Sequence, residues 1–223
     1  MDTQPIEESS FGESFKRLCE RAEATLDFST GDPFFEEFVQ CFIDHCDEEG
    51  LWKPRCRLIE KPPDDFGQEH SVWFNPSDAC YYKLTHSGFY GLNVVYRDEC
   101  DRYATPFQYL ERWLLHNQMF GDSVEWLGCF REKEESISLL IRQPAVEGVP
   151  ASDVEIHDFF KEVGWVPFRI GGEHAFYAQE NGIVISDTHR GNLVKTHGGL
   201  LVPIDLRLQR VRGSLQQAVL NQL

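Results

Sequence analysis

The chain has 223 residues, enough for one domain or for one domain with an added segment, and its hydrophobic content of 41% suits a packed core. The formal net charge is -16, because acidic residues outnumber basic ones 37 to 21. Such a surface repels phosphate backbones and anionic lipid, so we expect no nucleic acid and no membrane among the partners. The apolar runs are too short for a membrane helix, and the acidic start is unlike a secretory signal.

The seven cysteines are irregularly spaced and include no CxxC pair. That pattern is typical of free thiols in a reducing compartment, so we expect a cytoplasmic protein. A zinc site formed by Cys41, His45 and Cys46 is an alternative, although no second ligand pair accompanies these three residues.

Residues 8–49 are expected to be helical. The stretch DPFFEEFVQCF offers Asp32 as an N-cap and Pro33 as the first helical residue. Apolar residues follow at helical spacing, namely Phe35, Phe38, Val39 and Phe42. Because the next stretch, EKPPDDFGQE, has the composition of a loop, we expect an N-terminal helical segment over residues 1–50 and a main domain over residues 51–223.

The main domain begins with a predicted hairpin, in which the turn NPSD joins the runs EHSVWF and ACYYKLT. Lys83 lies near the end of the second run. Residues 91–97, GLNVVYR, are a further candidate strand.

The stretch TPFQYLERWLLHNQ predicts a helix with Thr105 as N-cap, Pro106 at the first position and Gln108 completing a capping box. Glu111 lies within the apolar stripe of this helix. A carboxylate there is costly unless it reaches water or meets a cation. Two interpretations remain open: Glu111 lies at the stripe's edge in water, or it forms a buried ion pair with a lysine from the sheet.

The rest of the chain reads as strands with one more helix. EWLGCFRE and SISLLIRQ predict two strands, and SDVEIHDFFKEVG predicts a helix capped by Ser152 and Glu155. HAFYAQENGIVISD and NLVKTHGGLLVPIDL each predict a hairpin, with Asn-Gly and Gly-Gly turns. This order indicates an α+β fold rather than alternating βαβ units.

Three oxygen-bearing side chains follow or precede short apolar runs near the end of the chain. Asp187 follows GIVIS, Asn192 precedes LVK, and Asp205 follows LLVPI. A tight hairpin can bring all three together, and two carboxylates with an amide oxygen suit Mg²⁺ held jointly with substrate phosphates. His189, in the same stretch, is expected to pack in the loop rather than to act as a base.

The string DTHRGN resembles the catalytic loop D-L-H-P-G-N of the aminoglycoside and choline kinase branch of the protein-kinase-like superfamily. More closely, the stretch from Gly67 to Leu206 resembles the small kinase domain found in polyvalent proteins of phages and mobile elements. Five motifs carry the resemblance, in this order: GQEHSV, YYKLT, LLHNQ, IRQPAVEG and DTHRGN. The resemblance implies a two-lobed kinase-like fold, with an antiparallel N-lobe sheet holding one helix over about 51–143, a reduced C-lobe over about 144–223 and extra N-terminal helices.

The resemblance also implies ATP and Mg²⁺ as cofactors and assigns roles to residues. Asp187 matches the catalytic aspartate that orients or deprotonates the attacking hydroxyl. Asn192 and Asp205 match the Mg²⁺ ligands. Lys83 matches the strand lysine that contacts the α- and β-phosphates, and Glu111 is the best candidate for the helix glutamate that holds this lysine.

Further positions match the nucleotide-binding part of the family. Val72 is expected to cover the base, and backbone groups of about Gln143 to Val146, including those of Ala145, are expected to bind adenine. The sequence departs from the superfamily in having no glycine-rich loop before Lys83 and in having Leu-Arg rather than Phe-Gly after Asp205.

Three functions are compatible with these patterns. An ATP- and Mg²⁺-dependent phosphotransferase would act on a hydroxyl of a protein or of a small molecule. A pseudokinase would use the same fold to bind nucleotide weakly or to bind partners without transfer, which the missing glycine-rich loop favours. A structural acidic adaptor is the third alternative.

Overall fold

The computed structural model describes residues 10–27, 35–54, 58–97, 100–132 and 136–223. The chain divides into two compact units. The first unit comprises the chain up to Gly91 together with Ala104–Ala145, and the second comprises Leu92–Tyr103 and Val146–Leu223. The fold is mixed α+β with antiparallel sheets, so the predicted fold class is confirmed at that level.

The first unit contains a five-stranded antiparallel sheet of order β1-β2-β3-β5-β4. Its strands are β1 (Asp65–Phe66), β2 (His70–Asn75), β3 (Cys80–Thr85), β4 (Glu125–Arg131) and β5 (Ile137–Pro144). The hairpin of β2 and β3 and the pair β4 and β5 confirm the sequence prediction. The short strand β1 was not predicted, because its residues belong to the loop-like stretch that precedes β2.

Helix α3 (Pro106–Phe120) begins with the predicted capping box. The Thr105 hydroxyl accepts a bond from the Gln108 N–H, and the Gln108 side chain accepts one from the Thr105 N–H. Gly121 ends the helix in a left-handed conformation, with φ of 66°, which suits glycine. Both ends of α3 are therefore set by local sequence.

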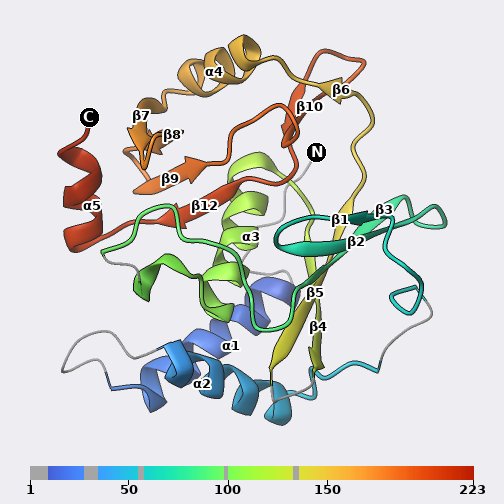
Figure 1. Cartoon of the computed structure of the whole chain (residues 1–223). Helices are drawn as coiled ribbons and strands as arrows, with labels where there is room; N and C mark the ends of the chain where they lie inside the picture. The colour runs from blue at the N-terminus through green and yellow to red at the C-terminus, as the bar shows by residue number, and fades with distance from the viewer. Residues whose placement is uncertain (1–9, 28–34, 55–57, 98–99, 133–135) are drawn as a thin grey trace. The chain divides into compact units, whose positions relative to one another are not determined.

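Helices α1 (Ser10–Thr25) and α2 (Phe35–Glu48) pack against each other and against α3 (Figure 1). They contribute to the same hydrophobic core as α3, β4 and β5, with members such as Leu18, Phe42, Trp113, Cys129 and Leu139. The predicted cap residues Asp32 and Pro33 lie outside the described residues.

The second unit contains two antiparallel sheets, a three-stranded one of order β11-β10-β6 and a four-stranded one of order β12-β9-β8-β7. The strands are β6 (Val149–Pro150), β7 (Val166–Ile170), β8 (Glu173–Ala178), β9 (Ile183–Ser186), β10 (Leu193–Lys195), β11 (Leu201–Pro203) and β12 (Arg207–Arg210). The helices are the short 3-10 helix η2 (Cys100–Arg102), α4 (Asp153–Glu162) and α5 (Gly213–Leu220). The capping box of Ser152 and Glu155 at α4 and both predicted hairpins are confirmed.

The prediction of a strand over residues 91–97 was wrong. In this stretch only Leu92 makes a ladder contact, an isolated bridge to Tyr103. Val94 and Val95 are instead buried in the core of the second unit, and the Gln209 side chain binds both the N–H and the carbonyl of Val95. These apolar residues thus belong to a loop in which the backbone of Val95 is hydrogen-bonded by the side chain of Gln209 rather than by a neighbouring strand.

Candidate functional site

Lys83 lies on the face of the first sheet that packs against α3. It pairs with Val72 on β2 and with Ile141 on β5, so these three side chains share one face. Lys83 is buried, and its Nζ lies 4.9 Å from the centroid of the Trp113 ring on α3. This is a cation–π contact that positions the ammonium group beside the helix.

Glu111 projects from another side of α3. It precedes Trp113 by two positions, which corresponds to about 200° around a helix. Burial raises the pKa of the Cys19 thiol on α1 to about 12, and the carboxylate of Glu111 contributes further to that rise. Glu111 is therefore close to α1 while Trp113 contacts Lys83, and an ion pair between Glu111 and Lys83 stays a prediction.

Sequence reasoning overlooked a charged pair between α3 and the turn before β2. Arg112, next to Glu111, donates from Nη1 to both carboxylate oxygens of Glu69 at 2.8 Å. Glu69 is part of the motif GQEHSV, whose acidic position had been given no role. The only signal in the sequence was an acid placed between a turn and a strand, which by itself does not identify its partner.

The end of β5 carries Gln143, whose side chain is buried on the same face as Lys83. Its Nε2 donates to Asp122 Oδ2 at 2.7 Å, and that oxygen lies 3.2 Å from His116 Nδ1. Burial by itself raises the pKa of Asp122, but the hydrogen bond and charge of His116, with the bond from Gln143, hold that pKa below its usual value. A buried polar chain thus joins α3 to the end of β5.

The chain passes from the first unit to the second at Leu92 and, after returning at Ala104, again between Ala145 and Val146. The Ala145 N–H donates to the Ala79 carbonyl at 2.9 Å, so that donor is already used within the first unit. Gln143 and Pro144 are ladder partners of Tyr81 and Cys80 on β3, and adenine binding by the stretch from Gln143 to Val146 stays a prediction.

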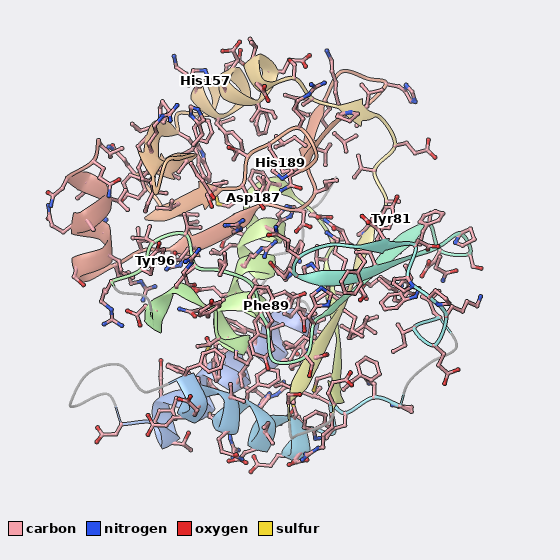
Figure 2. All side chains as sticks on the ribbon, in the orientation of Figure 1. Tyr81, Phe89, Tyr96, His157, Asp187 and His189 are labelled. Carbon is pink, nitrogen blue, oxygen red and sulfur yellow. The ribbon has the colours of Figure 1, made fainter. Side chains whose placement is uncertain are left out.

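In the second unit, Asp187 immediately follows β9 and adopts a left-handed backbone conformation with φ of 62°. Among the described non-glycine residues only Ala79 shares a positive φ, and such conformations gather at functional sites. The Asp187 carboxylate is half-buried and lies 3.4 Å from His189 Nε2 and 3.5 Å from Arg207 Nε. Figure 2 shows Asp187 and His189 together on the loop after β9.

Asn192 joins the two ends of this loop. Its Nδ2 donates to the Asp187 carbonyl at 2.9 Å, and its own carbonyl accepts from the N–H of Ile204 at 2.9 Å. Ile204 directly precedes Asp205, which is half-buried after β11. The three predicted residues Asp187, Asn192 and Asp205 therefore lie in one hydrogen-bonded loop cluster of the second unit.

The donor set of this cluster fits a hard divalent cation in its chemistry. Because the Asn192 Nδ2 is engaged by the Asp187 carbonyl, Oδ1 is the amide atom left to face a ligand. Mg²⁺ is commonly bound by one or two carboxylates together with substrate phosphates, which Asp187, Asp205 and this amide oxygen match. No cluster of three or more His, Cys, Asp or Glu suited to a metal occurs among the described residues, so Mg²⁺ binding stays a prediction.

The alternative zinc site at Cys41, His45 and Cys46 gains no support from the geometry. Cys46 Sγ instead lies 3.1 Å from Cys129 Sγ in the core of the first unit. Within the described part of the chain, no helix has the length and apolar character needed to cross a bilayer.

Comparison with known proteins gives one match that includes residues of both units. Residues 36–210 match the model of a family described as serine/threonine/tyrosine kinase found in polyvalent proteins. Searches of curated proteins and of solved structures gave no match. The matched residues include all five motifs, so the resemblance inferred from the sequence is confirmed.

Proposed function

We propose that this chain, which belongs to the family of serine/threonine/tyrosine kinases found in polyvalent proteins, transfers the γ-phosphoryl group of ATP to a hydroxyl acceptor. The observation that carries the proposal is the loop cluster of Asp187, Asn192 and Asp205. An aspartate with strained backbone geometry is held there by the amide that would also ligate the metal.

In this proposal the two units correspond to the lobes of a reduced kinase. The first unit, with its five-stranded sheet and α3, is the nucleotide-binding lobe, enlarged by α1 and α2. The second unit is the reduced C-lobe, and the stretch from Gln143 to Val146 is the hinge that binds adenine, with Val72 against the base. The division of the chain between Ala145 and Val146 supports this correspondence.

The residues of the proposed site divide the tasks of phosphoryl transfer among them. Asp187 orients the acceptor hydroxyl and takes its proton as the oxygen attacks the γ-phosphorus, while the bond to the β-phosphate oxygen breaks. The hydrogen bond from Asn192 Nδ2 to the Asp187 backbone carbonyl holds the main chain of Asp187 in place. The charge of Arg207 holds the Asp187 carboxylate in position. Lys83 neutralises the α- and β-phosphates, so that positioning and electrostatics supply most of the catalysis.

Bound Mg²⁺ would supply further neutralisation of phosphate charge, with Asn192 Oδ1 and Asp205 as its protein ligands. We also propose a protein or small-molecule acceptor, no nucleic-acid partner, and a place in the cytoplasm within a polyvalent protein of a mobile element. The charge of -16 supports the absence of a nucleic-acid partner, and the free thiols among the described cysteines support the cytoplasm.

A nucleotide-binding pseudokinase is the second candidate, and one observation favours it. The turn from β1 to β2 is a tight Gly67–Gln68–Glu69 connection, closed by the Gly67 N–H on the His70 carbonyl at 2.9 Å. It has one glycine and an acidic residue, and is therefore a weaker phosphate cover than a glycine-rich loop.

Two measurements separate the candidates. Nucleotide binding is tested by the melting temperature with Mg²⁺ and ATP, compared with that with Mg²⁺ alone. If ATP causes no shift, the structural adaptor is the function that remains. Transfer of label from γ-labelled ATP to proteins and small molecules of a cell extract tests catalysis. Transfer by the wild type that disappears in Asp187→Ala supports the kinase, whereas nucleotide binding without any transfer supports the pseudokinase.

A further inference from the structure

Glu69 and Arg112 form a nearly buried ion pair between the turn before β2 and helix α3. Arg112 Nη1 donates to both Glu69 oxygens at 2.8 Å, and the two side chains are only 7% and 15% exposed for Arg112 and Glu69. Charges removed from water to this extent are costly unless they remain paired. The pair therefore fixes the position of the turn relative to α3 more firmly than an exposed ion pair would.

Other contacts restrict the Glu69 carboxylate to this position. His70 Nε2 lies 3.2 Å from Glu69 Oε1 and 3.0 Å from the Tyr109 hydroxyl, which also belongs to α3. Gly91 lies against the carboxylate, because a Cβ at that position would be 2.5 Å from Oε2. The turn before β2 therefore contacts α3 through the Glu69 carboxylate, whose position is restricted by the side chains and backbone around it.

Trp113 links the ion pair to the strand lysine. The Arg112 guanidinium carbon lies 5.0 Å from the Trp113 ring centroid, and Lys83 Nζ lies 4.9 Å from the same centroid. One buried indole ring therefore contacts both cations, and a shift of Arg112 would be transmitted to the ring beside Lys83. The residues of the turn, the helix and the strand form one continuous set of contacts.

We propose, building on the proposed function, that Glu69, Arg112 and Trp113 are positioning residues for nucleotide binding. They hold the turn before β2 and the Lys83 ammonium group in the mutual arrangement that the phosphates require. None of the three touches the reacting atoms.

The chain contains a matched control for this cluster. Arg131 binds the Asp47 carboxylate at 3.2 and 3.4 Å and stacks over the Trp52 ring at 4.5 Å, again in the first unit. It reproduces the chemistry of an arginine, a carboxylate and an indole without contacting Lys83 in the described structure. Arg131→Gln therefore measures the effect of losing an exposed cluster of this kind, because the Arg131 and Asp47 side chains are 50% and 55% exposed.

The test uses the full chain and an acyl-phosphate derivative of ATP that acylates lysines near bound phosphates. The readouts are acylation of Lys83 by mass spectrometry, the Kd of Mg-ATP and the melting temperature. Glu69→Gln and Arg112→Gln are expected to weaken nucleotide binding and Lys83 acylation about tenfold or more, which is roughly 1.4 kcal/mol. Arg112→Lys is expected to recover part of that loss, and Arg131→Gln should leave both readouts unchanged.

The outcomes separate this inference from the proposed function. A wild type that neither binds Mg-ATP nor acylates at Lys83 overturns both. A wild type that does both, with Glu69→Gln and Arg112→Gln within about twofold of it in both readouts, overturns the positioning role alone. If those two variants do not fold, Trp113→Phe decides, because it leaves the ion pair intact: weaker Lys83 acylation supports the role, and unchanged acylation overturns it.

Discussion

The Asn192 side chain donates a hydrogen bond from Nδ2 to the carbonyl oxygen of Asp187 across 2.9 Å. This bond spans the turn that contains His189 and fixes the backbone of the proposed catalytic residue. It also determines which amide atom of Asn192 faces away from the loop. One residue therefore supports both the placement of a general base and the ligation of a cation.

Asn192→Ala removes both contributions. We expect the rate of phosphoryl transfer to fall about 100-fold, because a shift of about 1 Å in a catalytic group has an effect of that size. The melting temperature should change little, since Asn192 is only half-buried. Asn221→Ala, which removes an exposed amide near the end of α5, is the control, and equal transfer rates for the two variants would contradict the role given to Asn192.

His189 is expected to shape the loop rather than to act as the base. Its Nδ1 accepts the Gly191 N–H at 3.0 Å, so a neutral ring carries its proton on Nε2, which faces Asp187. That nitrogen then has no lone pair to receive a proton from a substrate. His189→Asn keeps an acceptor for the Gly191 N–H, and we predict activity within about fivefold of the wild type, the range of an exposed polar contact.

The comparison that decides this point is between His189→Asn and Asp187→Asn in the same transfer assay. If His189→Asn is as inactive as Asp187→Asn, the base is His189 and the assignment of Asp187 is wrong.

Asp122 makes the stability of the fold depend on pH. Its pKa in the folded chain is lowered from the ordinary 3.8, mainly by His116 acting against the effect of burial. A carboxylate with a lowered pKa stabilises the folded state above the unfolded pKa, and that contribution is lost as the pH falls through the folded value. We predict that Asp122→Asn lowers the free energy of unfolding at pH 7 and that the difference from the wild type shrinks below about pH 4.

Urea unfolding at a series of pH values measures this difference. Asp158→Asn, at a carboxylate 62% exposed, is the control and should show no such dependence. A difference between Asp122→Asn and the wild type that stays constant down to pH 2 would contradict the stabilisation of the Asp122 carboxylate by its contact with His116.

Asn117, from the motif LLHNQ, has a structural task. Its Nδ2 donates to the Val124 carbonyl and its Oδ1 accepts the Val124 N–H, both at 2.8 Å, so that it fastens β4 to the end of α3. Asn117→Ala leaves two buried backbone groups without their partner and should lower the free energy of unfolding by about 2 to 4 kcal/mol. Denaturant unfolding checks this, and a loss below about 0.5 kcal/mol, as for an ordinary surface substitution, would contradict it.

Local sequence signals predicted the elements whose ends are determined by their own residues. The capping boxes at Thr105 and Ser152 and the glycine turns of the two hairpins depend on contacts within a few positions, and the structure confirms them. Residues 91–97 have the composition of a strand but meet the Gln209 side chain, 114 positions away from Val95. The strand prediction failed because no local pattern reports such a partner.

The same limit applies to the candidate site. The motif DTHRGN predicted that Asp187 and Asn192 act together, and their side-chain to backbone contact follows from a separation of five residues. Helical periodicity placed the Glu111 carboxylate in the apolar stripe of its helix but could not identify the residues that contact it. The neighbouring Arg112 forms its ion pair with Glu69, 43 positions earlier, through the tertiary packing of α3 on the sheet.

The most direct test of the account is transfer of the γ-phosphoryl group from labelled ATP by the wild type, Asp187→Asn and Thr188→Ala at equal nucleotide occupancy. The account predicts that Asp187→Asn binds Mg-ATP as the wild type does but transfers label about 100- to 10,000-fold more slowly, the range typical of a lost general base. Thr188→Ala, a change in the same loop, should retain most of the activity. Equal transfer by the wild type and Asp187→Asn would contradict the central claim.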